Sequence, residues 1–265
     1  MGKTITICFT NNKGGSGKST TCSNLGAAMA QAGKKVLLID GDMQLNLSLA
    51  FFSEDWVLEH ATGEKNLYYA IKKQEDLSCY VVHTPYENLD LIPSSTLMSS
   101  IEYELFTKWQ REFILRKCIQ KIKETGAYDY ILIDTCPSLN TLTINALAAA
   151  DEVIIAANPQ FWAMVGLEDF LLTVRKIKSR VNSKLNVSGI LLTMCEERTN
   201  LCKVITDEVA ETFNGKLRIF DSKIPTTVKV GESVYYGEPL LEYAPRTKAC
   251  RAYQNLAKEL IADEG

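Results

Sequence analysis

Residues 4–19 read Thr4-Ile5-Thr6-Ile7-Cys8-Phe9-Thr10-Asn11-Asn12-Lys13-Gly14-Gly15-Ser16-Gly17-Lys18-Ser19. The first seven residues are apolar or β-branched and predict a buried strand. The glycine-rich run that follows predicts a turn, and the spacing of apolar residues over 19–32 predicts a helix. Such an arrangement cradles anions, because backbone N–H groups converge in the turn and the helix N-terminus adds partial positive charge. We therefore expect this turn to hold phosphate groups.

Two lysines flank the glycines of this turn. Lys18 is placed to reach the β- and γ-phosphates of a nucleotide, and the Ser19 hydroxyl is placed to bind Mg²⁺. The widespread pattern G-x-x-x-x-G-K-[ST] has glycine where this chain has Asn12, and this chain has an additional lysine, Lys13, ahead of the glycines. The motif K-G-G-x-G-K-[ST] resembles the deviant Walker A motif of the ParA/MinD class of ATPases.

That resemblance implies the cofactors ATP and Mg²⁺. It also implies a homodimer formed on ATP binding, in which Lys13 reaches across the interface to the nucleotide of the other subunit. The expected nucleotide-binding residues in the turn are Lys13, Gly14, Gly15, Ser16, Gly17, Lys18, Ser19 and Thr20, with Lys13 and Lys18 also assisting catalysis.

Composition bounds the class of protein. A chain of 265 residues with 46% hydrophobic and 23% charged residues fits one globular domain over 1–265. Eight cysteines without a C-x-x-C pair and only two histidines argue against a zinc site or a cysteine-bound cluster. Neither a signal peptide nor a run of roughly 18 apolar residues is visible, so we expect a reducing cytoplasm and no membrane partner.

The net charge of −3 is unevenly distributed. Residues 171–251 contain 14 Lys and Arg against 9 Asp and Glu, a surplus of +5, so the rest of the chain carries −8. A basic region on an acidic protein could contact a phosphate backbone, although solvated helix faces would give the same count.

Strand and helix patterns alternate along the chain. Strands are predicted at 4–10, 35–40, 80–83, 89–93, 130–134, 153–157 and 187–193. Helices are predicted at 19–32, 140–149, 165–180, 199–213 and 247–262, and a long polar helix within 99–124. This alternation predicts an α/β fold with a doubly wound, mostly parallel sheet flanked by helices, the P-loop NTPase fold. Residues 51–110 have the weakest periodicity and are expected to be the most variable insertion.

Carboxylates follow two of the predicted strands. Asp40 and Asp42 end the second strand in the run Asp40-Gly41-Asp42-Met43-Gln44-Leu45-Asn46, which resembles D-x-D-P-Q-G-N in the family, with Met43 and Leu45 in place of proline and glycine. Asp134 ends an apolar strand and resembles a Walker B carboxylate; Cys136 then replaces a proline of the switch II segment. The resemblance implies that Asp42 is the carboxylate needed for hydrolysis and that Ser19, Asp40 and Asp134 surround Mg²⁺. A pair of aspartates in a turn or at a helix cap is the structural alternative.

Motifs in the C-terminal third resemble those of chromosomal-type, Soj-like ParA partition ATPases. In such relatives, basic residues at the positions of Arg198 and Lys229 contact non-specific DNA across the dimer, and the loop containing Pro225 lies near the adenine. One basic residue of that loop is lost, since Thr226 stands in its place. Solvated surface charge remains the alternative for Arg198 and Lys229.

The leading hypothesis is a partition or segregation ATPase that dimerises on ATP, binds non-specific DNA, and is reset when a ParB-like partner stimulates its slow hydrolysis. It would be nucleoid-associated, and its cargo would be a plasmid, a chromosome or an integrative element. One alternative is a MinD-like membrane-cycling switch, which the acidic tip of the last helix disfavours. A second is a metal-cluster carrier, which the cysteine spacing does not support. A third is a nucleotide-gated adaptor without DNA binding.

Overall fold

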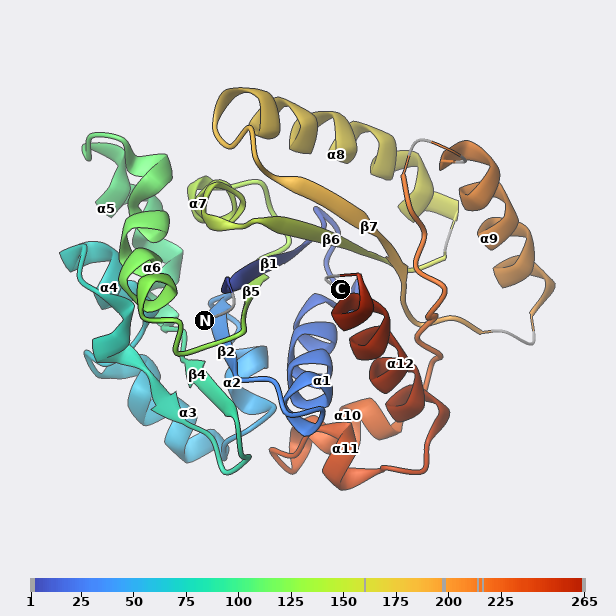
Figure 1. Ribbon diagram of the computed structural model, residues 1–265, viewed down its shortest axis with the longest axis horizontal. Helices are drawn as coiled ribbons and strands as arrows, with labels where there is room; N and C mark the ends of the chain where they lie inside the picture. Colours follow the sequence, from blue (N-terminus) through green and yellow to red (C-terminus); the bar gives the residue numbers. More distant parts are fainter. Residues whose placement is uncertain (1–2, 160, 197–198, 214, 216, 264–265) are drawn as a thin grey trace.

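One seven-stranded sheet organises the chain. The computed structural model describes residues 3–159, 161–196, 199–213, 215 and 217–263, with backbone alone at 161–165 and 200–201. The strand order is β3-β4-β2-β5-β1-β6-β7, and every neighbouring pair is parallel except β3 with β4 (Figure 1). The strands are β1 (Ile5–Thr10), β2 (Val36–Gly41), β3 (Val82–His83), β4 (Leu89–Ile92), β5 (Tyr130–Thr135), β6 (Glu152–Ala157) and β7 (Asn186–Leu192). The predicted doubly wound P-loop fold is confirmed.

Helices cover both faces of the sheet (Figure 1). The pleat sends alternate strand residues to opposite sides, so that Ile7 and Phe9 of β1 join one apolar core and Cys8 joins the other. The Ile7 side is covered by α1 (Lys18–Gln31), α2 (Asn46–Leu49), α11 (Leu240–Tyr243) and α12 (Lys248–Ala262). The Cys8 side is covered by α4 (Leu67–Lys73), α5 (Ile101–Phe106), α6 (Ile114–Thr125), α7 (Thr141–Ala149), α8 (Phe161–Arg180) and α9 (Asn200–Phe213).

Helix α1 lies very close to the sheet, which fixes the turn that precedes it. A Cβ atom on Gly26 would stand 2.6 Å from a terminal methyl group of the buried Leu38, so a larger residue would force Leu38 or the helix to shift. Helix α12 packs on the other side of α1, burying Tyr253 and Leu256. The start of α1 is therefore held at the carboxyl end of β1 by burial on two sides.

The predicted long helix within 99–124 is divided into separate helices. After the 3₁₀ turn η2 (Thr96–Ser100), α5 ends at Phe106, and a second 3₁₀ turn, η3 (Arg111–Phe113), precedes α6. Gln110 has a φ of 52°, which cannot continue a helix. The Asn145 side chain of α7 donates to the Arg111 carbonyl at 2.8 Å and accepts from the Leu115 N–H at 3.0 Å. A tertiary contact thus sets where α6 starts.

Residues 51–110 contribute to the sheet as well as to its cover. They contain β3, β4, α3 (Glu54–Thr62), α4, α5 and the 3₁₀ turn η1 (Leu77–Tyr80), and β4 pairs directly with β2. The short helices α2, α3, α4, α10 (Lys229–Tyr235) and α11 were not predicted from the sequence. That 51–110 is the most variable stretch stays a prediction.

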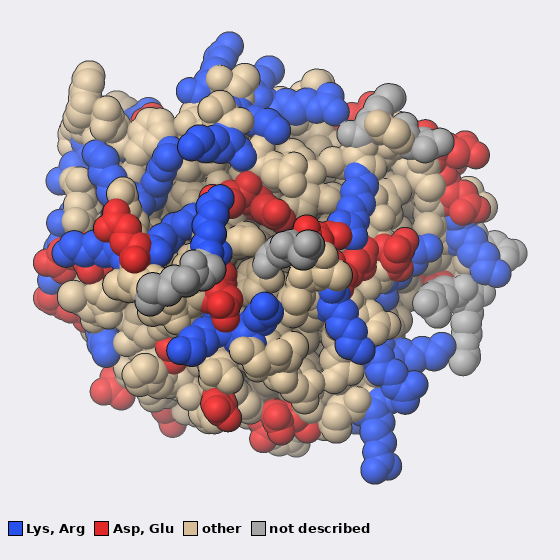
Figure 2. All heavy atoms as spheres, in the orientation of Figure 1, with Lys and Arg blue, Asp and Glu red and all other residues tan. Residues whose placement is uncertain are grey.

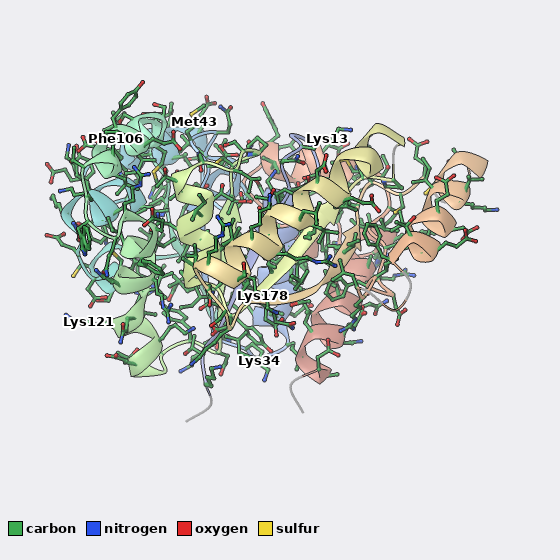
Figure 3. All side chains as sticks on the ribbon, turned by 90° about the horizontal axis from the view of Figure 1, so that it is seen from above. Lys13, Lys34, Met43, Phe106, Lys121 and Lys178 are labelled. Atoms are coloured by element: carbon green, nitrogen blue, oxygen red, sulfur yellow. The ribbon has the colours of Figure 1, made fainter. Side chains whose placement is uncertain are left out.

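The two ends of the parallel strands form opposite edges of the molecule. Lys13 and Met43 lie at the carboxyl edge, whereas Lys34, Lys121 and Lys178 lie at the amino edge (Figure 3). Figure 2 views the amino edge, where Lys and Arg side chains spread over much of the surface with acidic residues among them. Among the described residues, no helix is long and apolar enough to cross a membrane.

Candidate nucleotide-binding site

The turn between β1 and α1 has the backbone of a phosphate cradle. Gly15 and Gly17 have φ values of 68° and 79°, the left-handed region that glycine adopts without strain, and Gly17 is the N-cap of α1. The Thr193 hydroxyl, just after β7, donates to the Ser16 carbonyl at 2.8 Å. A Cβ on Gly17 would stand 3.4 Å from Thr193, so the turn is closely fitted against the end of β7.

Asn11 and Lys18 hold the two ends of the turn. Asn11 is buried; its amide donates to the Ala156 carbonyl of β6 at 2.6 Å, and its side-chain oxygen accepts the Lys13 N–H at 3.1 Å. The Lys18 ammonium reaches back to the Lys13 carbonyl at 3.4 Å. Burial lowers the pKa of Lys18, and the charges of Asp134 and Asp42 oppose that shift. Lys18 is therefore a buried cation aimed into the cradle.

Asp40 and Asp134 lie opposite each other on the paired strands β2 and β5. The Asp40 carboxylate is already engaged: it accepts the Ser48 N–H at 2.9 Å, the Ser48 hydroxyl at 2.7 Å and the Asp42 N–H at 3.2 Å. Burial nevertheless raises the pKa of Asp40 to about 6. Asp40 thus anchors the loop to α2; its predicted contact with Mg²⁺ stays a prediction.

Asp134 is as fully buried as Asp40, but neither of its carboxylate oxygens has a partner at hydrogen-bonding geometry. Burial raises the pKa of Asp134, the Asp40 charge adds to this, and the Ser19 hydroxyl and Lys18 ammonium act in the opposite direction. A buried carboxylate without donors is costly unless a cation binds it. Oxygen donors from Asp134 and Ser19 are the kind that Mg²⁺ takes, alongside phosphate oxygens and water. The residues present therefore fit that ion.

A cleft of about 480 Å³ lies over the cradle. Asp42 lines it, almost fully buried, with one carboxylate oxygen accepting the Gln44 N–H at 3.1 Å. Part of the lining was not predicted from the sequence, namely Ser23, Gln44, Asn46, Pro137, Met194 and the α10 residues Val230, Gly231 and Val234. No local pattern marks α10 as part of the site, since it lies more than 200 residues from the turn in sequence.

Pro225, a predicted base contact, is half-buried beside the cleft. Residues on either side of it pair with Cys195: the Cys195 N–H donates to the Ile224 carbonyl at 2.9 Å, and the Thr226 N–H donates to the Cys195 carbonyl at 3.2 Å. Cys195 follows Met194, which lines the cleft, but Pro225 itself does not line it. Contact between Pro225 and a base stays a prediction.

Only one of the two predicted DNA contacts lies among the described residues. Arg198 lies outside the described residues. Lys229 is the first residue of α10, one residue before Val230 of the cleft lining. Its ammonium pairs with Glu232 at 2.6 Å and lies over the Tyr243 ring at 5.6 Å, while the Tyr243 hydroxyl donates to Glu232 at 2.7 Å. One short helix therefore connects the cleft to this exposed cation.

The cradle, the buried carboxylate and the parallel sheet together define a P-loop nucleotide-binding protein. Residues 4–187 match the AAA domain family. The chain is 39% identical over 263 residues to the sporulation initiation inhibitor protein Soj of Bacillus subtilis, covering 99% of this chain and 100% of that protein. It is 38% identical over 265 residues to the chromosome-partitioning ATPase Soj of Treponema pallidum, covering 100% and 99%. The chain belongs to the ParA/Soj family of P-loop partition ATPases.

A solved structure outside partition proteins shares the same fold. It is cobyrinic acid a,c-diamide synthase from Mycobacterium smegmatis with bound ADP and magnesium, which is 26% identical with a TM-score of 0.82, covering 97% of this chain and 94% of that one. The fold alone therefore leaves room for other chemistry, and the choice of function rests on the closer partition relatives and on the site.

Proposed function

We propose that this protein is a DNA-partition ATPase whose ATP-bound state is a dimer that holds non-specific DNA. The observation that carries the proposal is the cradle over which Lys18, Asp42 and the unpartnered Asp134 converge. In it, the N–H groups of residues 14–20 would hold the phosphates, Lys18 would neutralise the β- and γ-phosphates, and Ser19 with Asp134 would hold Mg²⁺.

Hydrolysis requires a water molecule aligned with the γ-phosphate. Asp42 lines the cleft from the β2 side and would orient that water, while its bond from the Gln44 N–H fixes the carboxylate. Bound Mg²⁺ would supply neutralisation of charge on the transferring phosphate. With a single carboxylate positioning the water, we expect a slow intrinsic rate, suited to a switch that a partner protein resets.

Dimerisation would place the carboxyl edges of two subunits face to face. Lys13 and Met43 lie at this edge (Figure 3), so the loops carrying them would meet the partner. Lys13 would cross to the other nucleotide, which would couple ATP occupancy to dimer formation.

DNA would then contact Arg198 and Lys229 through its phosphates, without base readout. Helix α10 connects Lys229 to the cleft, which offers a route by which nucleotide state alters the DNA surface. A ParB-like partner would stimulate hydrolysis and release the DNA, and the protein would be nucleoid-associated between cycles.

The MinD-like alternative needs an amphipathic last helix that is free to lie on a bilayer. Helix α12 has its apolar face buried against α1 through Cys250, Tyr253, Leu256 and Leu260. Moving α12 onto a bilayer would remove its packing against α1, the helix that begins at the phosphate cradle. We therefore favour DNA over a membrane surface. The adaptor alternative, without DNA binding, is separated by experiment.

The test measures binding of a labelled non-specific duplex by fluorescence anisotropy, with ATP and Mg²⁺, ADP and Mg²⁺, or no nucleotide. We expect binding only with ATP, and a loss of about ten-fold or more in the double variant Arg198→Glu/Lys229→Glu. The matched control, Lys65→Glu/Lys258→Glu, makes the same charge change at exposed positions elsewhere. Equal DNA affinity in the two double variants would contradict the proposed DNA surface and favour an adaptor.

A further inference from the structure

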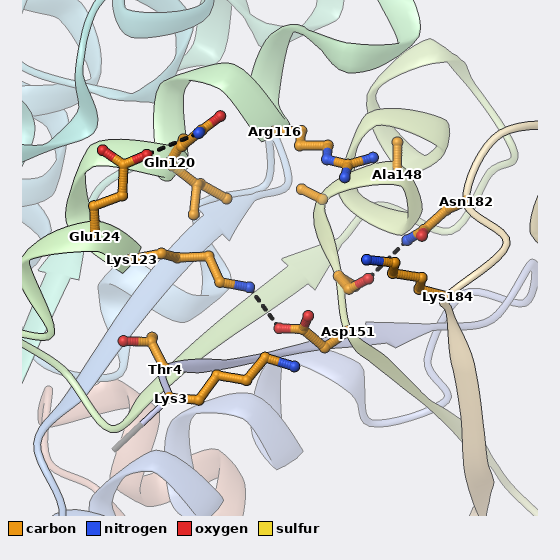
Figure 4. A pocket seen from close by; sticks show the side chains of 13 residues that line it. Lys3, Thr4, Arg116, Gln120, Lys123, Glu124, Ala148, Asp151, Asn182 and Lys184 are labelled. Atoms are coloured by element: carbon orange, nitrogen blue, oxygen red, sulfur yellow. Dashed lines mark hydrogen bonds and ion pairs between the residues drawn. The ribbon is translucent and has the colours of Figure 1, made fainter. Parts of the chain in front are cut away.

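A second hollow lies at the amino edge of the sheet, at the opposite end of β1 from the nucleotide cradle. It has a volume of about 350 Å³, within the range of small-ligand sites. Its walls come from the start of β1, from α6, from the end of α7 and from the segment joining α8 to β7 (Figure 4). Three alanines, Ala148, Ala149 and Ala150, form part of the lining and leave the space open.

Four cations surround this hollow: Lys3, Arg116, Lys123 and Lys184. Two acids, Glu124 and Asp151, also line it, which leaves a surplus of two positive charges on a protein whose net charge is −3. The side chains of Lys3, Lys123 and Lys184 extend toward Asp151 from three directions, and Arg116 lies across the hollow from Lys3 (Figure 4).

Both acids already have partners in the lining of the hollow or beside it. One Asp151 oxygen receives both the Lys123 ammonium at 2.5 Å and the Thr6 N–H at 2.9 Å, and Glu124 accepts from the Gln120 amide at 2.8 Å. Lys3, Arg116 and Lys184 make no ion pair with any residue that the structure describes. Three cations that line one hollow and form no ion pair there match a multiply charged anion.

We propose that this hollow binds a small anion bearing several phosphate groups, held by Arg116, Lys184 and Lys3. Arg116 can grip a phosphate through two parallel hydrogen bonds, and the lysines add point charge from the opposite wall. The phosphates of duplex DNA carry the same chemistry. The concave shape favours a compact ligand that enters the hollow, because a duplex would contact its rim only.

The test uses inorganic tripolyphosphate and isothermal titration calorimetry at low salt, where screening is weak. Lys18→Ala serves as the background, so that binding in the nucleotide cradle is suppressed. We expect one tripolyphosphate per chain in that background and an affinity about ten-fold lower when Arg116→Gln and Lys184→Gln are added. The matched control adds Lys34→Gln and Lys178→Gln, which remove two charges from the same edge outside the hollow.

Four results would overturn the proposal. The first is no binding of tripolyphosphate in the Lys18→Ala background. The second is an equal loss of affinity in the hollow pair and the control pair, which would mean that the edge attracts anions without a site. The third is a selective loss of duplex DNA binding in the hollow pair with unchanged tripolyphosphate affinity. The melting temperatures of both pairs without anion report whether Arg116 and Lys184 only offset the negative end of α7. The fourth result is a fall in melting temperature confined to the hollow pair, with the same tripolyphosphate affinity in the hollow pair and the control pair.

Discussion

The Thr193 hydroxyl donates to the Ser16 carbonyl at 2.8 Å and so joins the end of β7 to the phosphate cradle across 177 residues of sequence. Both residues are buried, so the Ser16 carbonyl has no water to replace that donor. The shape of the cradle therefore depends on a strand at the far end of the sheet as well as on its own glycines.

Replacing Thr193 tests this dependence. Thr193→Val keeps the side-chain shape but leaves the Ser16 carbonyl unpaired, at a cost of about 1–3 kcal/mol. We expect ATP affinity, measured by titration of a fluorescent ATP analogue, to fall about ten-fold. Thr193→Ser keeps the hydroxyl and should bind nearly as well as the wild type. Indistinguishable affinities for the Val and Ser variants would show that the bond does not shape the cradle.

Asp134→Asn removes a buried carboxylate that has no hydrogen-bond partner. Because burial raises the pKa of Asp134, the nucleotide-free fold holds its proton more tightly than the unfolded chain does, and stability falls as pH rises toward the folded-state pKa. We expect the variant to melt higher than the wild type without nucleotide, with a gap that widens from about pH 5 to pH 8.

The same variant should lose the increase in melting temperature that ATP with Mg²⁺ gives the wild type, since the carboxylate that faces the ion is gone. Asp207→Asn on the exposed side of α9 is the control for loss of one negative charge. A nucleotide-free variant that melts lower than the wild type, or that keeps the full Mg²⁺-dependent increase, would argue against Asp134 as the ion-facing carboxylate.

Ser48→Ala removes the hydroxyl that donates to Asp40 at 2.7 Å while keeping the backbone N–H bond. With one donor fewer, the pKa of Asp40 should rise above its value of about 6, and the free energy of unfolding at pH 7 should fall by about 1–3 kcal/mol. Urea denaturation measures this. Ser179→Ala, an exposed serine on α8, should change stability by less than about 0.5 kcal/mol. Equal stability of the two variants would mean that Ser48 does not support the loop.

Glu232 restrains the proposed DNA contact at Lys229, because their side chains pair at 2.6 Å. Glu232→Gln removes the counter-charge, so we expect ATP-dependent DNA affinity to rise about two- to five-fold and its salt dependence to steepen. Glu211→Gln, on an exposed part of α9, makes the same charge change elsewhere. Weaker DNA binding in Glu232→Gln than in this control would show that the pair positions Lys229 instead of restraining it.

The central part of the fold could be predicted from sequence because its signals are local. The apolar run of β1, the glycines of the turn and the small residues of α1 are contiguous, and each parallel strand buried on both faces reads as a continuous apolar stretch. Residues whose roles depend on distant partners could not be predicted in this way. Gln110 and Asn145 divide a helix that the local pattern favours, and Asn145 acts from another element.

The residues of the candidate site also divide into those that local sequence predicts and those that it does not. Asp134 lies near the end of β5, and Lys18, Ser19 and Asp42 follow strands that end at the same edge of the sheet, so topology alone brings them together. Helix α10 enters the cleft from the C-terminal part of the chain, and nothing in the run Lys229-Val230-Gly231 marks it as a nucleotide wall. The partner of Lys229, Glu232, is three residues away and could have been expected from helical spacing once α10 was known.

The central claim is that ATP converts this chain into a dimer through Lys13. Sedimentation velocity on the hydrolysis-blocked variant Asp42→Ala, with ATP and Mg²⁺, ADP and Mg²⁺, or no nucleotide, tests it most directly. We expect a dimer only with ATP, and a monomer that still binds ATP when Lys13→Ala is added. A monomer under all three conditions, or an ATP dimer that persists without Lys13, would contradict the account.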